Sequence, residues 1–291
     1  MRRISSTNPS PRRPAGADFG FTLIELVIVM VLIGILGAVV AMFGSPIRAG
    51  VEGQRRAELA DAADTAYRRM ARDIRTAVPN SIHLIDNSTI EFIPSKDGWR
   101  YAYDEAGDTG NSISFASAAD VDFDFIGSMY PGTTIKKGDF IVIGNWGYGQ
   151  VPDAYCPSAA VCNRAEVDSF ASPKVTLVSN PFATPGGPGP TISPPGQRFQ
   201  LVDKNEQAVT FHCDATTKEL TRHWKYGWTS AYLTGSSAVL ASNVGSCDFR
   251  YVAYHSQTWG LFRLEFTMQH ADLPGDAAVQ LVYQIHVNNT P

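Results

Sequence analysis

Residues 20–43 read GFTLIELVIVMVLIGILGAVVAMF, a long apolar run with a single carboxylate close to its start. The eighteen residues from Leu26 to Phe43 carry no charge and no hydroxyl group. This length is enough for a helix that spans a membrane. The carboxylate, Glu25, costs on the order of 2.5–3.5 kcal/mol in the hydrocarbon core on insertion scales. An acid retained at such a cost indicates a functional role.

The charges outside the apolar run are unevenly distributed. The first twenty residues hold four arginines and one acid, Asp18. Without them the chain has 20 basic and 27 acidic side chains, a balance of −7. This mildly acidic body argues against nucleic-acid binding, which needs a concentrated basic face. Basic residues before an apolar helix instead mark the end of the chain that stays in the cytoplasm.

Three kinds of segment fit an N-terminal apolar run of this length. A cleaved secretory signal would have a shorter apolar region, followed by a cleavage site of small residues. A plain signal anchor would explain the length and the basic flank. Neither of these two explains the carboxylate Glu25, so a third kind of segment has to be considered.

The residues Gly20-Phe21-Thr22-Leu23-Ile24-Glu25 resemble the processing signature of type IV pilins and of type II secretion pseudopilins. The resemblance covers about thirty residues, including the basic leader. It implies that a membrane aspartyl peptidase cuts on the cytoplasmic side after Gly20 and N-methylates Phe21. Glycine suits this position, because it lets a protease approach the scissile bond closely.

Glu25 then has two possible roles. In an assembling filament it can pair with the Phe21 amine of a neighbouring subunit, so that both charges leave the lipid together. The pair would specify axial register, because a misplaced subunit would keep a buried charge. The alternative is that Glu25 serves only in recognition by the peptidase.

Helical periodicity continues beyond the apolar run. Pro46, in Gly44-Ser45-Pro46, lacks a backbone donor and is expected to kink or loosen the helix. One apolar stripe follows, formed by Leu59, Ala63, Ala66, Met70, Ile74 and Ala77. The helix should end near Val78, because Pro79 cannot continue it. We expect the stripe to dock on a sheet while the first half projects, which is the lollipop architecture of the pilin family.

From residue 80 onward the pattern changes to short β-type runs separated by turn residues. The clearest alternation, Leu261 to Phe266, predicts a half-buried strand with Arg263 and Glu265 facing water. Residues 181–196 hold ten prolines and glycines and form the best candidate for an internal boundary. The candidate strands are 81–84, 89–93, 112–116, 121–126, 139–144, 174–179, 199–202, 207–213, 219–224, 247–254, 261–268 and 278–287.

The predicted fold is therefore α+β, with a long N-terminal membrane helix packed on a β-rich periplasmic head. Its parts are a cleaved cytoplasmic leader (1–20), a transmembrane or filament-core helix (21–45), an amphipathic second half of that helix (46–79) and the head (80–291), which contains the Pro/Gly-rich loop 181–196. The chain should sit in the bacterial inner membrane as a single-pass protein before it joins a pilus or pseudopilus.

Four cysteines suit two disulfides if the head is exported. Cys156 and Cys162 lie six residues apart, and Cys213 and Cys247 lie 34 apart. The simplest pairing is 156–162 with 213–247, although three pairings are possible and buried free thiols are the alternative. The larger loop would contribute roughly 3–4 kcal/mol and the smaller about 2 kcal/mol in the chain-entropy model. No CxxC motif is present, which disfavours zinc ribbons and thioredoxin-like sites.

Residues 55–83, RRAELADAADTAYRRMARDIRTAVPNSIH, narrow the resemblance. They are similar to the juxtamembrane helix of large minor pilins related to secretion pseudopilin J and to protein O of mannose-sensitive haemagglutinin pilus biogenesis. The function implied is a minor pilin that initiates, caps or forms the tip of a type IV pilus. The alternatives are a type II secretion pseudopilin of the J class, a pilus-displayed adhesin and a signal-anchored periplasmic domain. The implied partners are the prepilin peptidase and methyltransferase, other pilins, the inner-membrane assembly platform and membrane lipid.

Catalytic and cofactor signals are weak. No GxSxG, Walker A or HExxH motif occurs, so we expect no enzyme activity and no cofactor. The histidines at 83, 212, 223, 255, 270 and 286 are scattered, which is typical of surface or sheet positions. Weak calcium candidates are Asp104 and Asp108 in an acidic loop, and Asp120 and Asp122 near an expected strand; solvent-facing acids are the commoner explanation. An aromatic group suggests either a contact patch for a neighbouring subunit or a carbohydrate, or packing in the core and at strand edges: Trp224, Tyr226, Trp228, Tyr232 and Trp259.

Overall fold

The computed structural model describes residues 20–102, 110–183, 196–253, 259–270 and 278–290. It divides into two compact units, Met1–Gly53 and Gln54–Pro291. One long helix, α1 (Leu23–Arg75), has residues in both units. The remaining elements are fourteen strands and one short 3-10 helix, η2 (Ala159–Val161), counted over the described ranges. The calcium candidates Asp104 and Asp108, His255, residues 1–19 of the leader and residues 184–195 of the Pro/Gly-rich loop lie outside those ranges.

Helix α1 is 53 residues long, close to the length that the sequence pattern predicts. It runs through Gly44-Ser45-Pro46 without a break, so the pause expected there does not interrupt the helix. A proline removes only one backbone hydrogen bond, and the remaining bonds of the helix continue on both sides of it. The helix ends at Arg75, where the Thr76 amide donates to the carbonyls of Arg72 and Asp73. Such shared bonds tighten the last turn of a helix.

The stripe predicted from periodicity is buried: its first five members lie on one face of the second half of α1, and Ala77 follows the end of the helix. Its members range from fully buried to 7% exposed: Leu59, Ala63, Ala66, Met70, Ile74 and Ala77. They share one hydrophobic core with residues of two antiparallel sheets. At the edge of this core, the Tyr67 ring stacks on Tyr283 with 4.0 Å between centroids. Arg222 Nε adds an ion pair to Asp73 of α1 at 2.8 Å.

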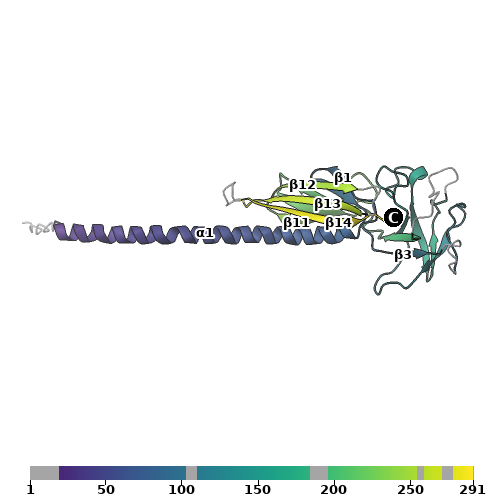
Figure 1. The fold of residues 1–291 in the computed structure, drawn as a ribbon, viewed down its shortest axis with the longest axis horizontal. Helices are drawn as coiled ribbons and strands as arrows, with labels where there is room; N and C mark the ends of the chain where they lie inside the picture. Colours follow the sequence, from purple (N-terminus) through teal and green to yellow (C-terminus); the bar gives the residue numbers. More distant parts are fainter. Residues whose placement is uncertain (1–19, 103–109, 184–195, 254–258, 271–277, 291) are drawn as a thin grey trace, which may run out of the picture. The chain divides into compact units, whose positions relative to one another are not determined.

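The two sheets lie along the second half of α1 (Figure 1). The five-stranded sheet has the order β1-β2-β9-β10-β11, with β1 (His83–Asp86), β2 (Thr89–Phe92), β9 (Val209–Asp214), β10 (Glu219–Trp224) and β11 (Ser236–Ser242). The three-stranded sheet has the order β12-β13-β14, with β12 (Val244–Ala253), β13 (Trp259–Met268) and β14 (Val279–Asn288).

The alternation predicted for β13 is confirmed. Phe262, Leu264 and Phe266 are buried, while Arg263 and Glu265 lie partly exposed on the opposite face. The apolar face of β13 thus points into the core shared with α1.

A closed six-stranded barrel forms the other part of the head. Its strand order is β3-β4-β7-β6-β5-β8, with β3 (Asp97–Tyr101), β4 (Asp122–Ile126), β5 (Phe140–Ile143), β6 (Arg164–Ala171), β7 (Lys174–Leu177) and β8 (Arg198–Val202). All six strands fall between β2 and β9 in the chain, yet β2 and β9 pair directly in the five-stranded sheet. The barrel is therefore an insertion between two neighbouring strands.

The barrel has a hydrophobic core of its own. This core is rich in aromatic side chains, including Tyr101, Phe123, Phe125, Phe182 and Phe199. A third, smaller cluster joins barrel residues such as Val142 and Val202 to Val78 and Ile93 from the sheet side.

The Pro/Gly-rich loop does not separate two structural units. It connects β7 to β8, and both strands belong to the same barrel. The internal boundary predicted at residues 181–196 is therefore wrong, because the barrel begins after β2 and ends before β9. Local composition marks a turn-rich segment, whereas strand pairing decides where a unit ends.

Eleven of the twelve predicted strands overlap observed ones, and residues 112–116 form none. Three observed strands, β3, β6 and β11, are missing from the prediction. β3 contains Gly98 and charged residues, β6 is charged on its outer face, and β11 is made of small polar and apolar residues. None of them has the continuous β-branched or aromatic run that marks a strand in isolation.

Candidate processing and assembly site

The Gly20-Phe21 bond stands clear of packed structure. Gly20 is exposed, and a Cβ added to it would meet no atom within 4 Å. The Phe21 side chain is 80% exposed. Both residues precede the first turn of α1, which begins at Leu23. The bond therefore lies outside the helix in accessible chain, which is where proteases cut most readily.

Thr22 caps the helix, a role that the sequence reasoning missed. Its Oγ1 accepts a hydrogen bond from the Glu25 amide at 3.3 Å, and its carbonyl accepts one from the Leu26 amide at 3.2 Å. Thr-x-x-Glu is the capping-box spacing, so the signal was present in residues 22–25. The cap fixes the helix start two residues after the bond and places Glu25 in the first turn.

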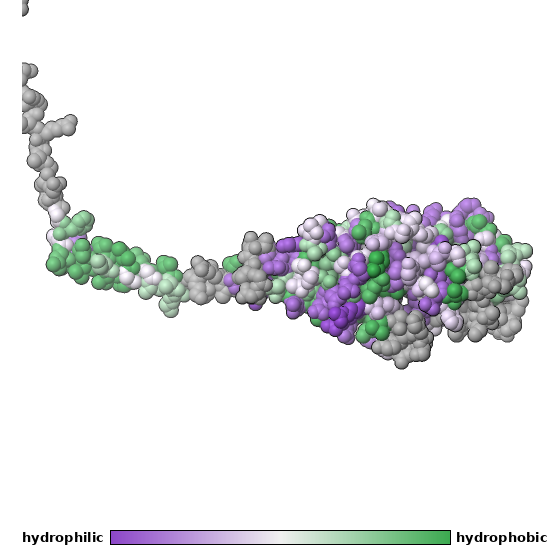
Figure 2. Space-filling view, turned by 90° about the horizontal axis from the view of Figure 1, so that it is seen from above, coloured by the Kyte–Doolittle hydropathy of each residue, from purple (hydrophilic) through white to green (hydrophobic). Residues whose placement is uncertain are grey.

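The helix that follows exposes apolar side chains on every side. The segment Leu23–Met42 spans 20 residues with a mean hydropathy of 3.0, and none of it is buried within the chain. Figure 2 shows most of the surface of this part of α1 as hydrophobic. At 1.5 Å per residue it is about 30 Å long, the thickness of a bilayer core. A helix that is hydrophobic all round needs lipid or other helices around it.

Residues 17–41 match the prokaryotic N-terminal methylation motif. This match supports a type IV pilin-like or pseudopilin-like subunit. The motif implies processing by a prepilin peptidase and assembly with other pilins, and it agrees with a single-pass membrane anchor followed by a β-rich head. No curated protein and no solved structure matches the chain.

The four cysteines form the two pairs that their spacing favours. Cys156 bonds to Cys162, with 4.3 Å between Cα atoms, and Cys213 bonds to Cys247, with 6.2 Å. The second bond joins β9 to β12 and so connects the two sheets. The first closes a short loop beside the barrel.

The acids of β4 already have protein partners. Asp122 and Asp124 lie on the face opposite the buried Phe123 and Phe125, as alternation predicts. Asp122 accepts hydrogen bonds from Asn111 and from Lys174, and Asp120 accepts one from the Ser114 amide at 2.7 Å. No group of three metal-ligating side chains occurs among the described residues. The calcium candidates Asp104 and Asp108 lie outside those ranges, so calcium binding stays a prediction.

The aromatic group singled out in the sequence does not form one surface. Tyr226 is buried, and its hydroxyl donates to Glu91 Oε1 at 2.7 Å. Trp228 packs against the Arg164 guanidinium, 3.6 Å from its ring centroid, at the junction with the barrel. Trp259 lies on β13, 40% exposed and apart in sequence from the others. For Tyr226 and Trp228 packing is the observed role.

Glu91 occupies a buried polar cluster between β1, β2 and the segment after β10. His83 Nε2 lies 3.4 Å from Glu91 Oε2, and the Tyr226 hydroxyl also contacts Thr210 Oγ1 at 2.8 Å. Burial raises the pKa of Glu91 to about 7 and lowers the pKa of His83 to about 4. Near pH 6 both groups are therefore neutral, and their contact is between uncharged side chains.

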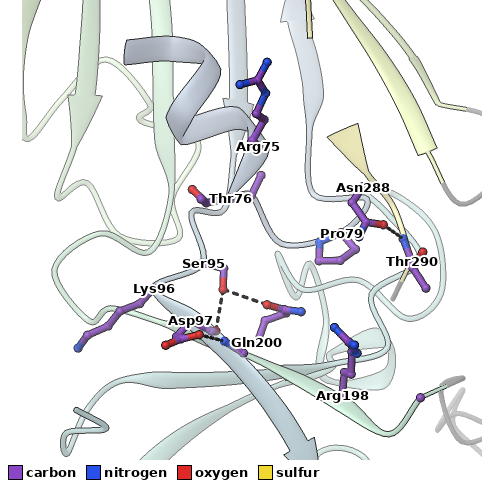
Figure 3. Close-up of a pocket in the computed structure, with 13 residues that line it drawn as sticks. Arg75, Thr76, Pro79, Ser95, Lys96, Asp97, Arg198, Gln200, Asn288 and Thr290 are labelled. Atoms are coloured by element: carbon purple, nitrogen blue, oxygen red, sulfur yellow. Dashed lines mark hydrogen bonds between the residues drawn. The ribbon is translucent and has the colours of Figure 1, made fainter. Parts of the chain in front are cut away.

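A cavity of about 600 Å³ lies between the end of α1, β3 and β8. Figure 3 shows Ser95 among the lining residues, with its Oγ hydrogen-bonded to the Asp97 carbonyl at 2.8 Å and to Gln200 Oε1 at 3.0 Å. Arg75 and Arg198 stand apart from this hydrogen-bonded group. The described lining holds no histidine, and the hydrogen-bond partners of Ser95 Oγ are backbone carbonyls and an amide oxygen.

Proposed function

We propose that this chain is a minor pilin-type subunit that helps to initiate, cap or form the tip of a type IV pilus. The observation that carries the proposal is the methylation motif at the start of a helix that is first fully exposed and apolar and then, in its second half, buried in the head. One helix thus offers a polymerising surface and the anchor of a folded domain. In this proposal residues 1–20 are the leader and residues 21–45 enter the membrane and then the filament core.

Glu25 provides the assembly register in this proposal. After cleavage the Phe21 amine is a cation beside a helix N-terminus, which is itself the positive end of the helix dipole. An anion from a neighbouring subunit would neutralise the Phe21 amine and interact favourably with the helix dipole. Glu25, in the first turn of the neighbouring helix, supplies such an anion. Correct axial stagger neutralises each pair, whereas a wrong stagger leaves charges in an apolar core.

The size of the head favours a minor subunit over a repeating one. The unit Gln54–Pro291 contains a complete barrel inserted between β2 and β9. A repeating subunit must fit against neighbours on all sides along the filament. A subunit at the end of a filament has neighbours on one side only, which leaves room for a larger head. The similarity of residues 55–83 to haemagglutinin-pilus protein O and pseudopilin J agrees with such a place. Because the same similarity includes pseudopilin J, a type II secretion pseudopilin of the J class is the second candidate function.

Deletion of the gene, followed by complementation, separates the candidates. A pilus initiator predicts that filament number falls severely while secretion of folded exoproteins is unchanged. A secretion pseudopilin predicts the reverse, with exoproteins held in the periplasm. A displayed adhesin predicts normal filaments that no longer attach to surfaces. Normal filament number and normal filament length in the deletion strain would contradict the proposal.

A further inference from the structure

The segment Gly144–Cys156, GNWGYGQVPDAYC, leaves the barrel after β5 and is held by buried polar anchors. We call it the aromatic loop. Asn145 is buried; its Nδ2 donates to the Pro79 carbonyl at 2.8 Å, and its Oδ1 accepts from the Ala154 amide at 3.0 Å. Asp153 is fully buried and accepts from the amides of Gly149 and Tyr155 at 2.9 and 2.8 Å. These bonds, together with the Cys156–Cys162 disulfide, fix the loop's conformation.

This rigid loop displays two large aromatic side chains. Trp146 is 57% exposed and Tyr148 is 56% exposed. Gly147 separates them with a φ of 131°, and a Cβ there would lie 3.3 Å from the Asn80 carbonyl oxygen. Glycine is therefore needed for the loop to lie this close to the chain at Asn80. Exposed aromatic side chains on a preorganised loop are typical of a binding site, because exposure costs free energy that packing would recover.

The Tyr148 ring has a fixed orientation. It stacks on His83, with 3.8 Å between centroids and 6° between planes, and Tyr155 meets it edge-on at 5.5 Å. Tyr155 is held in turn by a hydrogen bond from its hydroxyl to the Ser81 carbonyl at 3.0 Å. A ring fixed in this way loses little conformational entropy when a ligand covers it.

Trp146 and Tyr148 border a cavity of about 370 Å³. This volume lies in the range of small-ligand sites. The cavity is lined by Asn80, Ile82, His83, Leu84, Trp146, Gly147, Tyr148, Gln150 and Tyr251, with no aspartate, glutamate, lysine or arginine among them. Burial holds the pKa of His83 at about 4, so the lining carries no formal charge at neutral pH.

We propose that this cavity binds a neutral saccharide. A sugar ring has an apolar C–H face that stacks on an aromatic side chain, and hydroxyl groups that exchange hydrogen bonds with amides such as Gln150, which is exposed at the rim. A charged ligand would find no counter-charge. A protein partner would need a broad, flat contact, whereas this site is a small concavity between two aromatic rings and an amide. The proposal concerns the head alone and is independent of the role in a filament.

The test uses the full-length protein in phosphatidylcholine nanodiscs, because glucoside and maltoside detergents would themselves present neutral sugars. The probe is a printed panel of neutral oligosaccharides ending in glucose, galactose, mannose or N-acetylglucosamine, with sialylated and sulfated ones beside them. We expect binding to neutral members only. Trp146→Ala and Tyr148→Ala should each raise the dissociation constant about tenfold or more. This constant is measured by calorimetry with the neutral oligosaccharide that binds the unaltered protein most tightly. Gln150→Ala should raise the same dissociation constant by a smaller factor.

Tyr130→Ala is the matched control, since Tyr130 is 73% exposed and does not line the cavity. It should bind as the unaltered protein does. Near-ultraviolet circular dichroism checks the fold of each variant, and Gln150→Ala replaces Trp146→Ala if the latter misfolds. The proposal is overturned if no neutral saccharide binds, if only charged glycans bind, or if binding is unchanged in both Tyr148→Ala and Gln150→Ala.

Discussion

Glu25 is the one carboxylate in an otherwise uncharged stretch of α1, and its amide is held by the Thr22 cap. Within the isolated chain the side chain of Glu25 is exposed, as are its apolar neighbours. Among the described residues no ion pair neutralises this carboxylate within one chain, and we propose that assembly supplies its partner. The sequence alone singled out Glu25 as a candidate functional residue. The capping role of Thr22 was recognised from its hydrogen bond to the Glu25 amide.

Replacing Glu25 by alanine should permit cleavage but reduce incorporation into filaments by an order of magnitude or more. The reason is the loss of the partner for the Phe21 amine, which would otherwise be a lone charge in an apolar core. Immunoblots of sheared filaments, normalised to membrane-bound protein, measure incorporation. Glu52→Ala is the control, because Glu52 is an exposed acid of the same helix that lies outside the methylation motif. Equal incorporation of the two variants would refute the register mechanism.

The pH dependence of stability should reveal the buried Glu91. The folded protein keeps this carboxyl protonated up to about pH 7, whereas the unfolded chain releases the proton near pH 4.5. The folded state thus binds more protons in this window, and the contribution of Glu91 to stability is lost as the pH rises through it. His83 has the opposite effect. Between about pH 4 and pH 6.5 the unfolded chain binds a proton at this histidine and the folded chain does not, so the contribution of His83 to stability rises with pH.

Glu91→Gln isolates the carboxyl, since the amide oxygen can still accept from Tyr226. Relative to the unaltered protein, the variant should gain stability between pH 4.5 and pH 7, by roughly 3 kcal/mol. Urea unfolding at several pH values measures this difference. Glu166→Gln, at an exposed position of β6, controls for removing a carboxylate. A difference for Glu91→Gln that is constant with pH would contradict the assignment.

At the scale of elements, the second half of α1 belongs to the hydrophobic core of the head. Met70 lies at the middle of the buried stripe and is fully buried. Met70→Ala should lower the free energy of unfolding of the head by about 2–5 kcal/mol, because it removes buried methylenes and leaves a cavity. Urea denaturation followed by tryptophan fluorescence measures the loss. Arg69→Ala, next to it on the exposed face, should change stability by less than about 0.5 kcal/mol.

The two disulfides should differ in their contribution to stability. Removing Cys213–Cys247 by a double alanine substitution should cost roughly 3–4 kcal/mol, because the unfolded chain then regains the conformational freedom of a 34-residue loop. Removing Cys156–Cys162 should cost about 2 kcal/mol, since its loop is only six residues long. Chemical denaturation of both variants measures the two losses. A larger cost for the shorter loop would contradict the entropic argument.

Local patterns predicted most elements and could not predict how they combine. The stripe from Leu59 to Ala77 and the alternation in β13 follow from the periods of helix and strand, which depend only on nearby residues. The pairing of β2 with β9 joins Thr89 to His212, and no local signal marks a contact over that separation. The barrel and its boundaries were missed for this reason. The aromatic loop was missed as well, because exposure of Trp146 and Tyr148 depends on packing from distant segments.

At the scale of the whole molecule, two regions with different surface chemistry share one polypeptide. The segment up to Gly53 is dominated by an exposed apolar helix, and the segment from Gln54 onward buries its apolar residues in three clusters. The first region requires lipid or a filament, whereas the second folds around its own cores. We propose that cleavage at Gly20 allows the first region to pass from the lipid into a filament.

The mature N-terminus therefore tests the central claim most directly. Mass spectrometry of the protein purified from cell membranes should find that residues 1–20 are absent and that the chain begins at Phe21, with a mass one methyl group above that of the unmodified sequence. Gly20→Val should remain uncut, whereas Gly37→Val, an identical change at another uncrowded glycine of this region, should be processed normally. An intact chain that begins at Met1, or one cut at any bond other than Gly20-Phe21, would contradict the account.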